Sequence, residues 1–230
     1  MIVGYDRVHI LFLRLNFIVF TPAGMASFVS IITLLALLLI GTSLVLVLVL
    51  HAIKPEISPR VRMLSELEIG RHGWLMRQTF ALFAVGVALV GYQAAAQGAL
   101  IGGSVMVVAA IGPIGAAIFI TEPIDVPTER RGREDRIHAA FGALFLLLFP
   151  VAASLVTGAG LAALQPLGLW LWALVSLIWL SLVALFAVTG TGPGRGQKLG
   201  VDLPLGVPNR INMLSISVWL IAVSIALRSA

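Results

Sequence analysis

The chain has 230 residues, of which 60% are hydrophobic and 11% charged, and its mean hydropathy is +1.07. This composition excludes an ordinary water-soluble domain, whose exterior needs more charged side chains. The net charge of +5 does not indicate nucleic acid as a partner, because the basic residues are confined to short segments between apolar runs. The absence of cysteine excludes disulfides, thiolate nucleophiles and cysteine-ligated metals.

Residues 1–25 are expected to form an N-terminal lead-in at the membrane interface. Polar residues interrupt its apolar stretch, and Pro22 with Gly24 are expected to break any helix before the first span. No small-residue cleavage site followed by a soluble domain comes after it, so a signal peptide is not expected. Met25 is an alternative start of the protein.

Four uncharged runs follow, and together they are long enough for six transmembrane helices of about 20 residues each. The two longest runs contain turn signals at 93–98 and 158–166, where Gln, Gly and Pro replace Leu and Val. The sequence therefore predicts an all-α polytopic integral membrane protein, a bundle of about six transmembrane helices in one domain, residues 26–230. The expected spans are 26–50, 76–96, 99–120, 137–157, 167–188 and 211–227.

The orientation follows from the basic residues. In the six-span topology, twelve Lys and Arg residues lie on one side of the membrane and three on the other. The positive-inside bias then places the charged loops in the cytoplasm and both termini outside. Thirteen of the fifteen basic residues are Arg, which together with many Ala, Gly and Leu residues is typical of a GC-rich bacterial genome. We therefore expect a multi-pass protein of the bacterial cytoplasmic (inner) membrane.

The third span, 99–120, is unusually rich in small residues. Gly98 and Gly102 form a small-xxx-small pair, and further Gly and Ala residues continue this surface. We expect this helix to lie inside the bundle. Pro113 in this span and Pro150 in the fourth each free a backbone carbonyl and are expected to kink their helices.

Polar side chains that could carry chemistry gather at the charged ends of the spans. A carboxylate at Glu134 or Asp135 could orient the imidazole of His138, because these positions lie four and three residues before it on a helix. A metal site needs roughly three or four ligands, and His72 is the only other histidine nearby, so neither a metal nor a cofactor is expected. The catalytic candidates are Glu122, Asp125 and His138, and the candidates for binding a ligand or lipid headgroup are Ser65, Arg77 and Arg210.

Several patterns near these candidates indicate structure rather than catalysis. Ser65 has no nucleophile-elbow pattern around it, and with Glu68 three residues later it predicts a capping box. The glycine-rich segment 189–198 lacks the Gly-Lys-Ser/Thr that closes a phosphate loop. Charges at the membrane edge are costly unless paired. We therefore expect Arg77 or Arg210 to hydrogen-bond to Glu122, Asp125 or Ser65; the alternative is that both snorkel into the headgroup layer.

Four segments carry a family resemblance: I-S-P-R-V-R-M-L-S-E-L-E-I-G-R-H-G-W-L-M-R-Q-T-F at 57–80, F-I-T-E-P at 119–123, I-H at 137–138, and the Arg of P-N-R-I at 208–211. On these segments the chain resembles the bacterial membrane family catalogued as domain of unknown function 998. Where that family has F-P-T-D, this chain has Ile120 and Glu122, so the resemblance implies Glu122, or Asp125 in its place, at the acidic position. It implies a six-helix membrane protein and no established activity.

The sequence thus predicts a membrane protein without a recognisable catalytic centre, either a structural or accessory subunit or a lipid-interacting protein. Its expected partners are membrane lipids and, through small-residue helix faces, other membrane protein subunits. One alternative is a membrane-embedded lipid-modifying enzyme that uses the acid and histidine cluster at the cytoplasmic face. A small-molecule transporter is a third alternative, disfavoured by the lack of ionisable residues in the middle of the spans.

Overall fold

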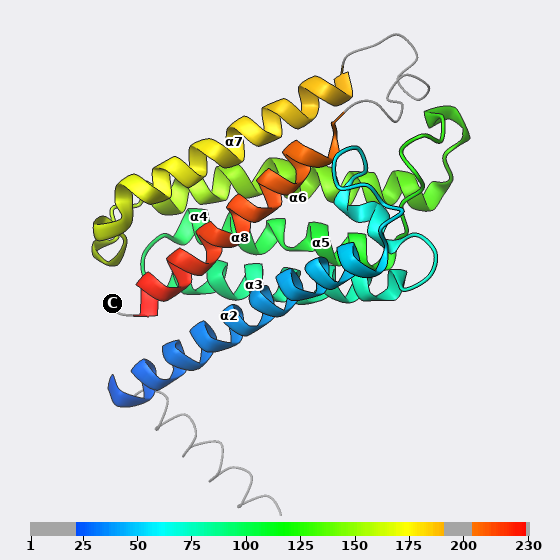
Figure 1. The fold of residues 1–230 in the computed structure, drawn as a ribbon. Coiled ribbons are helices and arrows are strands. Elements are labelled where there is room, and N and C mark those ends of the chain that lie inside the picture. The colour runs from blue at the N-terminus through cyan, green and yellow to red at the C-terminus, as the bar shows by residue number, and fades with distance from the viewer. Residues whose placement is uncertain (1–21, 191–203, 229–230) are drawn as a thin grey trace, which may run out of the picture.

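The structure, a computed structural model, describes residues 22–190 and 204–228, and this part of the chain is helical with connecting loops (Figure 1). Six of its helical segments are long and apolar enough to cross a membrane, with α4 and α5 together forming one span, which confirms the all-α polytopic prediction. The α-helices are α2 (Pro22–Ile53), α3 (Gly73–Ala96), α4 (Leu100–Ala109), α5 (Ile111–Ile118), α6 (Arg133–Thr157), α7 (Gly168–Gly190) and α8 (Gly206–Arg228), and the short 3-10 helices are η1 (Leu64–Glu68), η2 (Thr128–Arg130) and η3 (Ala162–Leu167).

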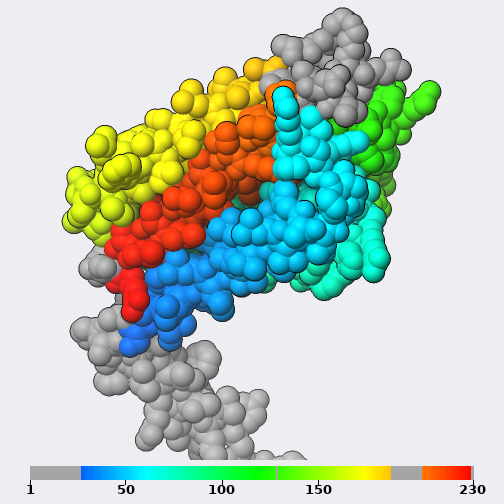
Figure 2. Space-filling view, viewed as in Figure 1, coloured from blue at the N-terminus to red at the C-terminus, as the bar shows by residue number. Residues whose placement is uncertain are grey.

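The polar loops gather at one end of the bundle. Figure 1 shows the loop after α2, the loop after α5 and the first turn of α8 at this end, which we call the charged end. The α3–α4 turn, the α6–α7 connection and the last turn of α8 lie at the opposite end. In Figure 2, α8 lies between α7 and α2, and the loop after α2 covers the start of α8, where the Gly206 N–H donates to the Arg60 carbonyl over 3.0 Å.

The interior of the bundle is apolar, and so is most of its exterior. α3 packs against α2, α4, α5 and α8, while α6 packs against α4, α5 and α7. A buried aromatic row runs through the core from Phe83 through Phe145 and Phe149 to Trp219. Large aliphatic side chains cover the outer faces, as at Leu169, which is 83% exposed. This inside-and-outside apolar pattern suits a protein whose solvent is lipid.

Glycines let the third span enter the bundle. A Cβ at Gly103 would overlap the carbonyl oxygen of Gly91, and a Cβ at Gly102 would come within 2.8 Å of the Val156 nitrogen. α4 therefore touches the backbones of α3 and α6 directly, as small residues allow in membranes. The expectation that this span lies inside the bundle holds only for its small-residue face: Gly and Ala residues such as Gly102 and Ala116 are buried, whereas Ile101 and Ile118 on the other face are exposed.

The two prolines act differently. The third span is broken at Ala110 into α4 and α5, because Pro113 has no N–H to donate to the carbonyl of Ala109. By contrast α6 continues past Pro150, and the expected kink there does not interrupt the helix. The carbonyl of Pro150 itself accepts a hydrogen bond from the Ser154 hydroxyl over 2.8 Å.

Helix boundaries differ from the sequence expectations at three places. α2 already includes Pro22 and Gly24, because proline is tolerated in the first turn of a helix; most of the lead-in, residues 1–21, lies outside the described residues. For the same reason α8 begins at Gly206, with Pro208 in its first turn, rather than at 211. Gln93, expected in a turn, is buried within α3, where it donates to the Thr33 hydroxyl over 2.6 Å.

Candidate functional site

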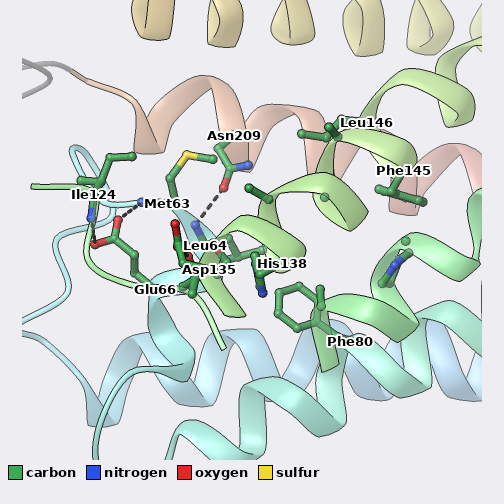
Figure 3. A pocket seen from close by; sticks show the side chains of 18 of the residues that line it. Met63, Leu64, Glu66, Phe80, Ile124, Asp135, His138, Phe145, Leu146 and Asn209 are labelled. Atoms are coloured by element: carbon green, nitrogen blue, oxygen red, sulfur yellow. Dashed lines mark hydrogen bonds between the residues drawn. The ribbon is translucent and has the colours of Figure 1, made fainter. Parts of the chain in front are cut away.

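A cavity of about 290 Å³ lies at the charged end, between α3, α5, α6, α7 and α8 (Figure 3). Its deeper walls are apolar and are formed by side chains such as Phe80, Phe83, Phe145, Leu146 and Met213. Its other end is formed by the polar loops and the first turns of α6 and α8. The polar residues that line this end are Ser65, Glu66, Thr121, Glu122, Arg131, Asp135, His138 and Asn209.

Glu66 builds the loop that closes the cavity. One carboxylate oxygen accepts the Met63 N–H over 2.8 Å, and the other accepts the Ile124 N–H over 3.2 Å (Figure 3). The second oxygen also accepts a hydrogen bond from the Arg62 guanidinium over 2.9 Å. Met63 is therefore the N-cap residue of η1, and Glu66 is its capping carboxylate. The expected box of Ser65 with Glu68 is wrong by two residues, because the short helix begins at Leu64.

Asn209 ties α8 to the same loop. Its side-chain oxygen accepts the Leu64 N–H over 2.9 Å, a contact between residues 145 positions apart in the chain (Figure 3). This satisfies a backbone donor at the start of η1 that has no helical partner. The amide group of Asn209 is left as a hydrogen-bond donor at the cavity wall.

Asp135 holds the loop after α5 against the start of α6. One oxygen accepts the Thr121 hydroxyl over 3.0 Å and the Glu122 N–H over 2.8 Å. The other lies 3.4 Å from the Arg131 guanidinium. Both oxygens of this carboxylate therefore contact the loop. The helical spacing had suggested that Asp135 orients His138, and this expectation is wrong.

His138 is oriented instead by two groups from other segments. Its Nδ1 lies 2.7 Å from the carbonyl oxygen of Phe119 and 3.3 Å from the Glu68 carboxylate, and its ring meets Phe80 edge-on. Because both oxygens are acceptors, Nδ1 carries the proton. In the neutral ring Nε2 is then a hydrogen-bond acceptor, and it has no hydrogen-bond partner among the described residues.

The Glu68 carboxylate contacts His138 at Nδ1 and does not line the cavity. Burial raises the pKa of its carboxyl to about 7, although the Thr121 N–H, donated over 2.5 Å, and the positive charge of Arg77 oppose that rise. The second carboxylate oxygen is buried without a partner among the described residues. Nearby, the buried Lys54 ammonium donates to the carbonyls of Leu67 and Ile69, which fixes the end of η1 that carries Glu68.

Arg210 fastens α8 to α2 and to the loop. Its Nε donates to Nε2 of His51 over 2.9 Å, and its Nη1 donates to the carbonyls of Arg62 and Gly206. The opposite nitrogen of His51 lies 2.8 Å from the Val47 carbonyl, so Nε2 is an acceptor in the ring. The second guanidinium nitrogen of Arg210 is buried without a partner among the described residues.

The expected arginine pairing is wrong in its choice of arginine. Within residues 22–190 and 204–228, neither Arg77 nor Arg210 hydrogen-bonds to any of the three expected acceptors. Arg62 binds Asp125 instead, through two hydrogen bonds of 3.0 and 3.1 Å, and also Glu66. The Arg62 hydrogen bonds lower the pKa of the Asp125 carboxyl.

The structure thus brings together three of the six candidates from the sequence: Ser65, Glu122 and His138 line the cavity. Asp125 lies outside it on an exposed ion pair, and neither Arg77 nor Arg210 lines it. The site candidates from the sequence did not include Glu66, Glu68 or Asn209, and Asp135 was expected there only as a partner of His138. The one available signal was the pair of carboxylates among apolar residues in L-S-E-L-E-I, which indicates buried acids. No group of three or more potential metal ligands occurs among the described residues.

The family model described as a protein of unknown function, DUF998, matches residues 37–226. The chain belongs to this family. The matched region of this DUF998 chain contains every lining residue of the cavity and all of the spans, apart from residues 27–36 of the first span and 227–228 of the sixth. No curated protein and no solved structure matches the chain.

Proposed function

We propose that this DUF998 protein binds one amphiphilic molecule, such as a single-chain lipid, in the cavity at its charged end. The observation that carries the proposal is the division of the cavity into a deep apolar part and a polar end. Ligand sites have this form, and a volume of about 290 Å³ is near the lower limit for small-molecule pockets, which begin at roughly 300 Å³. The alkyl chain would lie beside Phe145 and Leu146, and the head beside His138 and Asn209.

Affinity for such a ligand would come mainly from its head. An alkyl chain gains little when it moves from lipid to an apolar protein wall, because the two surroundings are similar. Hydrogen bonds at the polar end, in contrast, form where the dielectric constant is low and are stronger there than in water. The buried polar residues that line this end, such as Asn209 and His138, are 6% exposed.

Packing favours this function over that of an accessory subunit. The glycines of the third span, which could have offered a face to other membrane proteins, contact segments of the same chain, as Gly102 does with α6 and Gly112 with Phe141 and Phe145. The close approach that small residues permit is therefore used within the bundle. A lipid ligand needs no such face.

A cavity-filling substitution tests the proposal. A Cβ at Gly142 meets no heavy atom within 4 Å, and Gly142 lines the cavity, so Gly142→Leu places a side chain in it. The protein would be reconstituted in phosphatidylcholine nanodiscs and photolabelled with a diazirine analogue of myristyl alcohol. We expect saturable labelling of peptides from α5 and α6, reduced about tenfold or more by the substitution, a loss of more than 1 kcal/mol in binding free energy.

Gly41→Leu is the matched control, since a Cβ at Gly41 also meets nothing within 4 Å but Gly41 does not line the cavity. It should label like the unchanged protein. Ala143→Leu is a second cavity variant in case the first fails to fold. Labelling confined to the outer helix faces, or equal in the cavity and control variants, would overturn the proposal.

One observation favours a second function, the membrane-embedded lipid-modifying enzyme. Glu68 and Phe119 hold the imidazole of His138 so that Nε2 is available as a base beside the cavity. On this hypothesis the protein would change the mass of an added lipid during incubation, and His138→Gln would stop this change without preventing binding. An unchanged lipid mass across lipid classes would contradict it.

For the orientation, we infer a bacterial inner-membrane protein with the charged end in the cytoplasm, supported by the twelve basic residues on that side against three on the other. Single cysteines can report it, because the chain has none of its own. Ser58→Cys and Glu129→Cys at the charged end should be inaccessible to an impermeant reagent in intact cells, and Ala159→Cys accessible. Labelling of Glu129→Cys from outside would reverse the orientation.

A further inference from the structure

Some hydrogen-bonding groups at the polar end of the cavity already have partners, and others remain available to a ligand. Both oxygens of Glu66 and both of Asp135 already have donors from the loops. Four groups have no hydrogen-bond partner among the described residues: Nε2 of His138, the amide group of Asn209, the hydroxyl of Ser65 and the second carboxylate oxygen of Glu122. A ligand head would therefore meet these groups first.

Of these groups, the imidazole of His138 has the best-defined orientation. It is 6% exposed, its ring is held against Phe80, and its Nδ1 proton points to Phe119 and Glu68. The neutral ring therefore presents Nε2 as an acceptor and cannot turn to present a donor without losing both contacts. Nε2 is left as an acceptor in the wall of a largely apolar cavity, so a head that donates a hydrogen bond to it would be favoured.

The charge of the lining residues restricts the head further. Among the described residues that line the cavity, Glu66, Glu122 and Asp135 contribute three carboxylates and Arg131 contributes the one guanidinium. The guanidinium of Arg62 lies outside the lining and is shared between Glu66 and Asp125. With His138 neutral, these described lining residues carry a net charge of −2, which disfavours a phosphate or carboxylate head in a site of low dielectric constant.

We propose that the cavity selects amphiphiles whose head donates a hydrogen bond and carries no negative charge, an alcohol or an amine, and that Nε2 of His138 accepts this hydrogen bond. This inference rests on the proposed function, since it concerns the head of the amphiphile in the same cavity. Glu68 acts as a positioning residue, because it touches Nδ1 of the histidine and does not line the cavity.

Four photolabelling probes with the same diazirine-bearing chain test the selectivity: the alcohol, its methyl ether, the primary amine and the monophosphate. We expect the alcohol or the amine to label the cavity at least tenfold more efficiently than the phosphate. The methyl ether, which has the same oxygen but no donor, should label severalfold less than the alcohol. Stronger labelling by the amine identifies an ammonium head, and stronger labelling by the alcohol identifies a hydroxyl head.

Variants separate selectivity from folding. In His138→Phe, the alcohol and ether should label about equally, because the acceptor is lost while the apolar cavity remains. His138→Gln, whose side-chain oxygen is an acceptor, should restore part of the preference, and Glu68→Gln should reduce it without changing labelling by the ether. A change confined to overall labelling, with the alcohol-to-ether ratio intact, would exclude His138 as the acceptor.

The failures of the two proposals are distinguishable. If no probe labels the cavity saturably, the amphiphile-binding function itself is wrong. If the phosphate labels the cavity as well as the alcohol or better, the cavity binds amphiphiles but the proposed selectivity is wrong.

Discussion

The buried Glu68 carboxyl should make the stability of the protein depend on pH. Its pKa is raised from about 4.5 to about 7, chiefly because burial disfavours the charged form. The folded chain therefore binds this proton more tightly than the unfolded chain does. Between about pH 4.5 and 7 the folded state holds more protons, so the free energy of unfolding falls as pH rises through this window.

The size of the effect follows from the same pKa values. Each tenfold change in proton affinity corresponds to about 1.4 kcal/mol, so a pKa moved from 4.5 to about 7 corresponds to roughly 3 kcal/mol at the alkaline end of the window. Glu68→Gln replaces the titrating group with a neutral amide of similar shape. The variant should lack most of this slope and should be more stable than the unchanged protein above pH 7 by about 1 to 2 kcal/mol, because the new amide also lacks a full set of partners.

Thermal or denaturant unfolding in detergent, followed from pH 5 to 8 for both proteins, measures this difference. Glu134→Gln is the matched control, because it removes an exposed carboxylate at the start of α6 and no buried one. His138 contacts Glu68, so the double variant with His138→Gln isolates the coupling between the two side chains. Parallel profiles for Glu68→Gln and the unchanged protein would refute the reasoning.

Two further predictions concern packing and charge. Gly103→Val should lower the free energy of unfolding by about 2 kcal/mol or more, because its Cβ would overlap the carbonyl of Gly91 and separate α3 from α4; an unfolding midpoint equal to that of the unchanged protein would contradict this contact. Arg62→Ala should lower the free energy of unfolding by about 3 kcal/mol, since it leaves the 2%-exposed carboxylate of Glu66 without its cation. Asp125→Ala removes a 47%-exposed partner of the same arginine and should lower the free energy of unfolding by less than about 1 kcal/mol. Unfolding measured on these two variants together decides whether the buried or the exposed pair stabilises the loop.

The six spans and the position of the charged loops could be predicted from the sequence alone. In lipid each span satisfies its own backbone hydrogen bonds, so length and hydropathy decide it locally, without knowledge of its neighbours. The glycines of the third span were equally informative, since small residues in a membrane helix indicate close helix contacts. The break at Ala110 followed from the missing N–H of Pro113.

The cavity and its polar partners depended on the tertiary structure. Glu68 meets His138 across 70 residues, and Asn209 meets the Leu64 N–H across 145, because the loop after α2, the start of α6 and the start of α8 converge at one end of the bundle. Spacing within one helix had instead suggested Asp135 as the partner of His138. Hydropathy determines which segments cross the membrane, but side-chain packing between the helices determines which of their ends meet, and that packing decided which acids are buried.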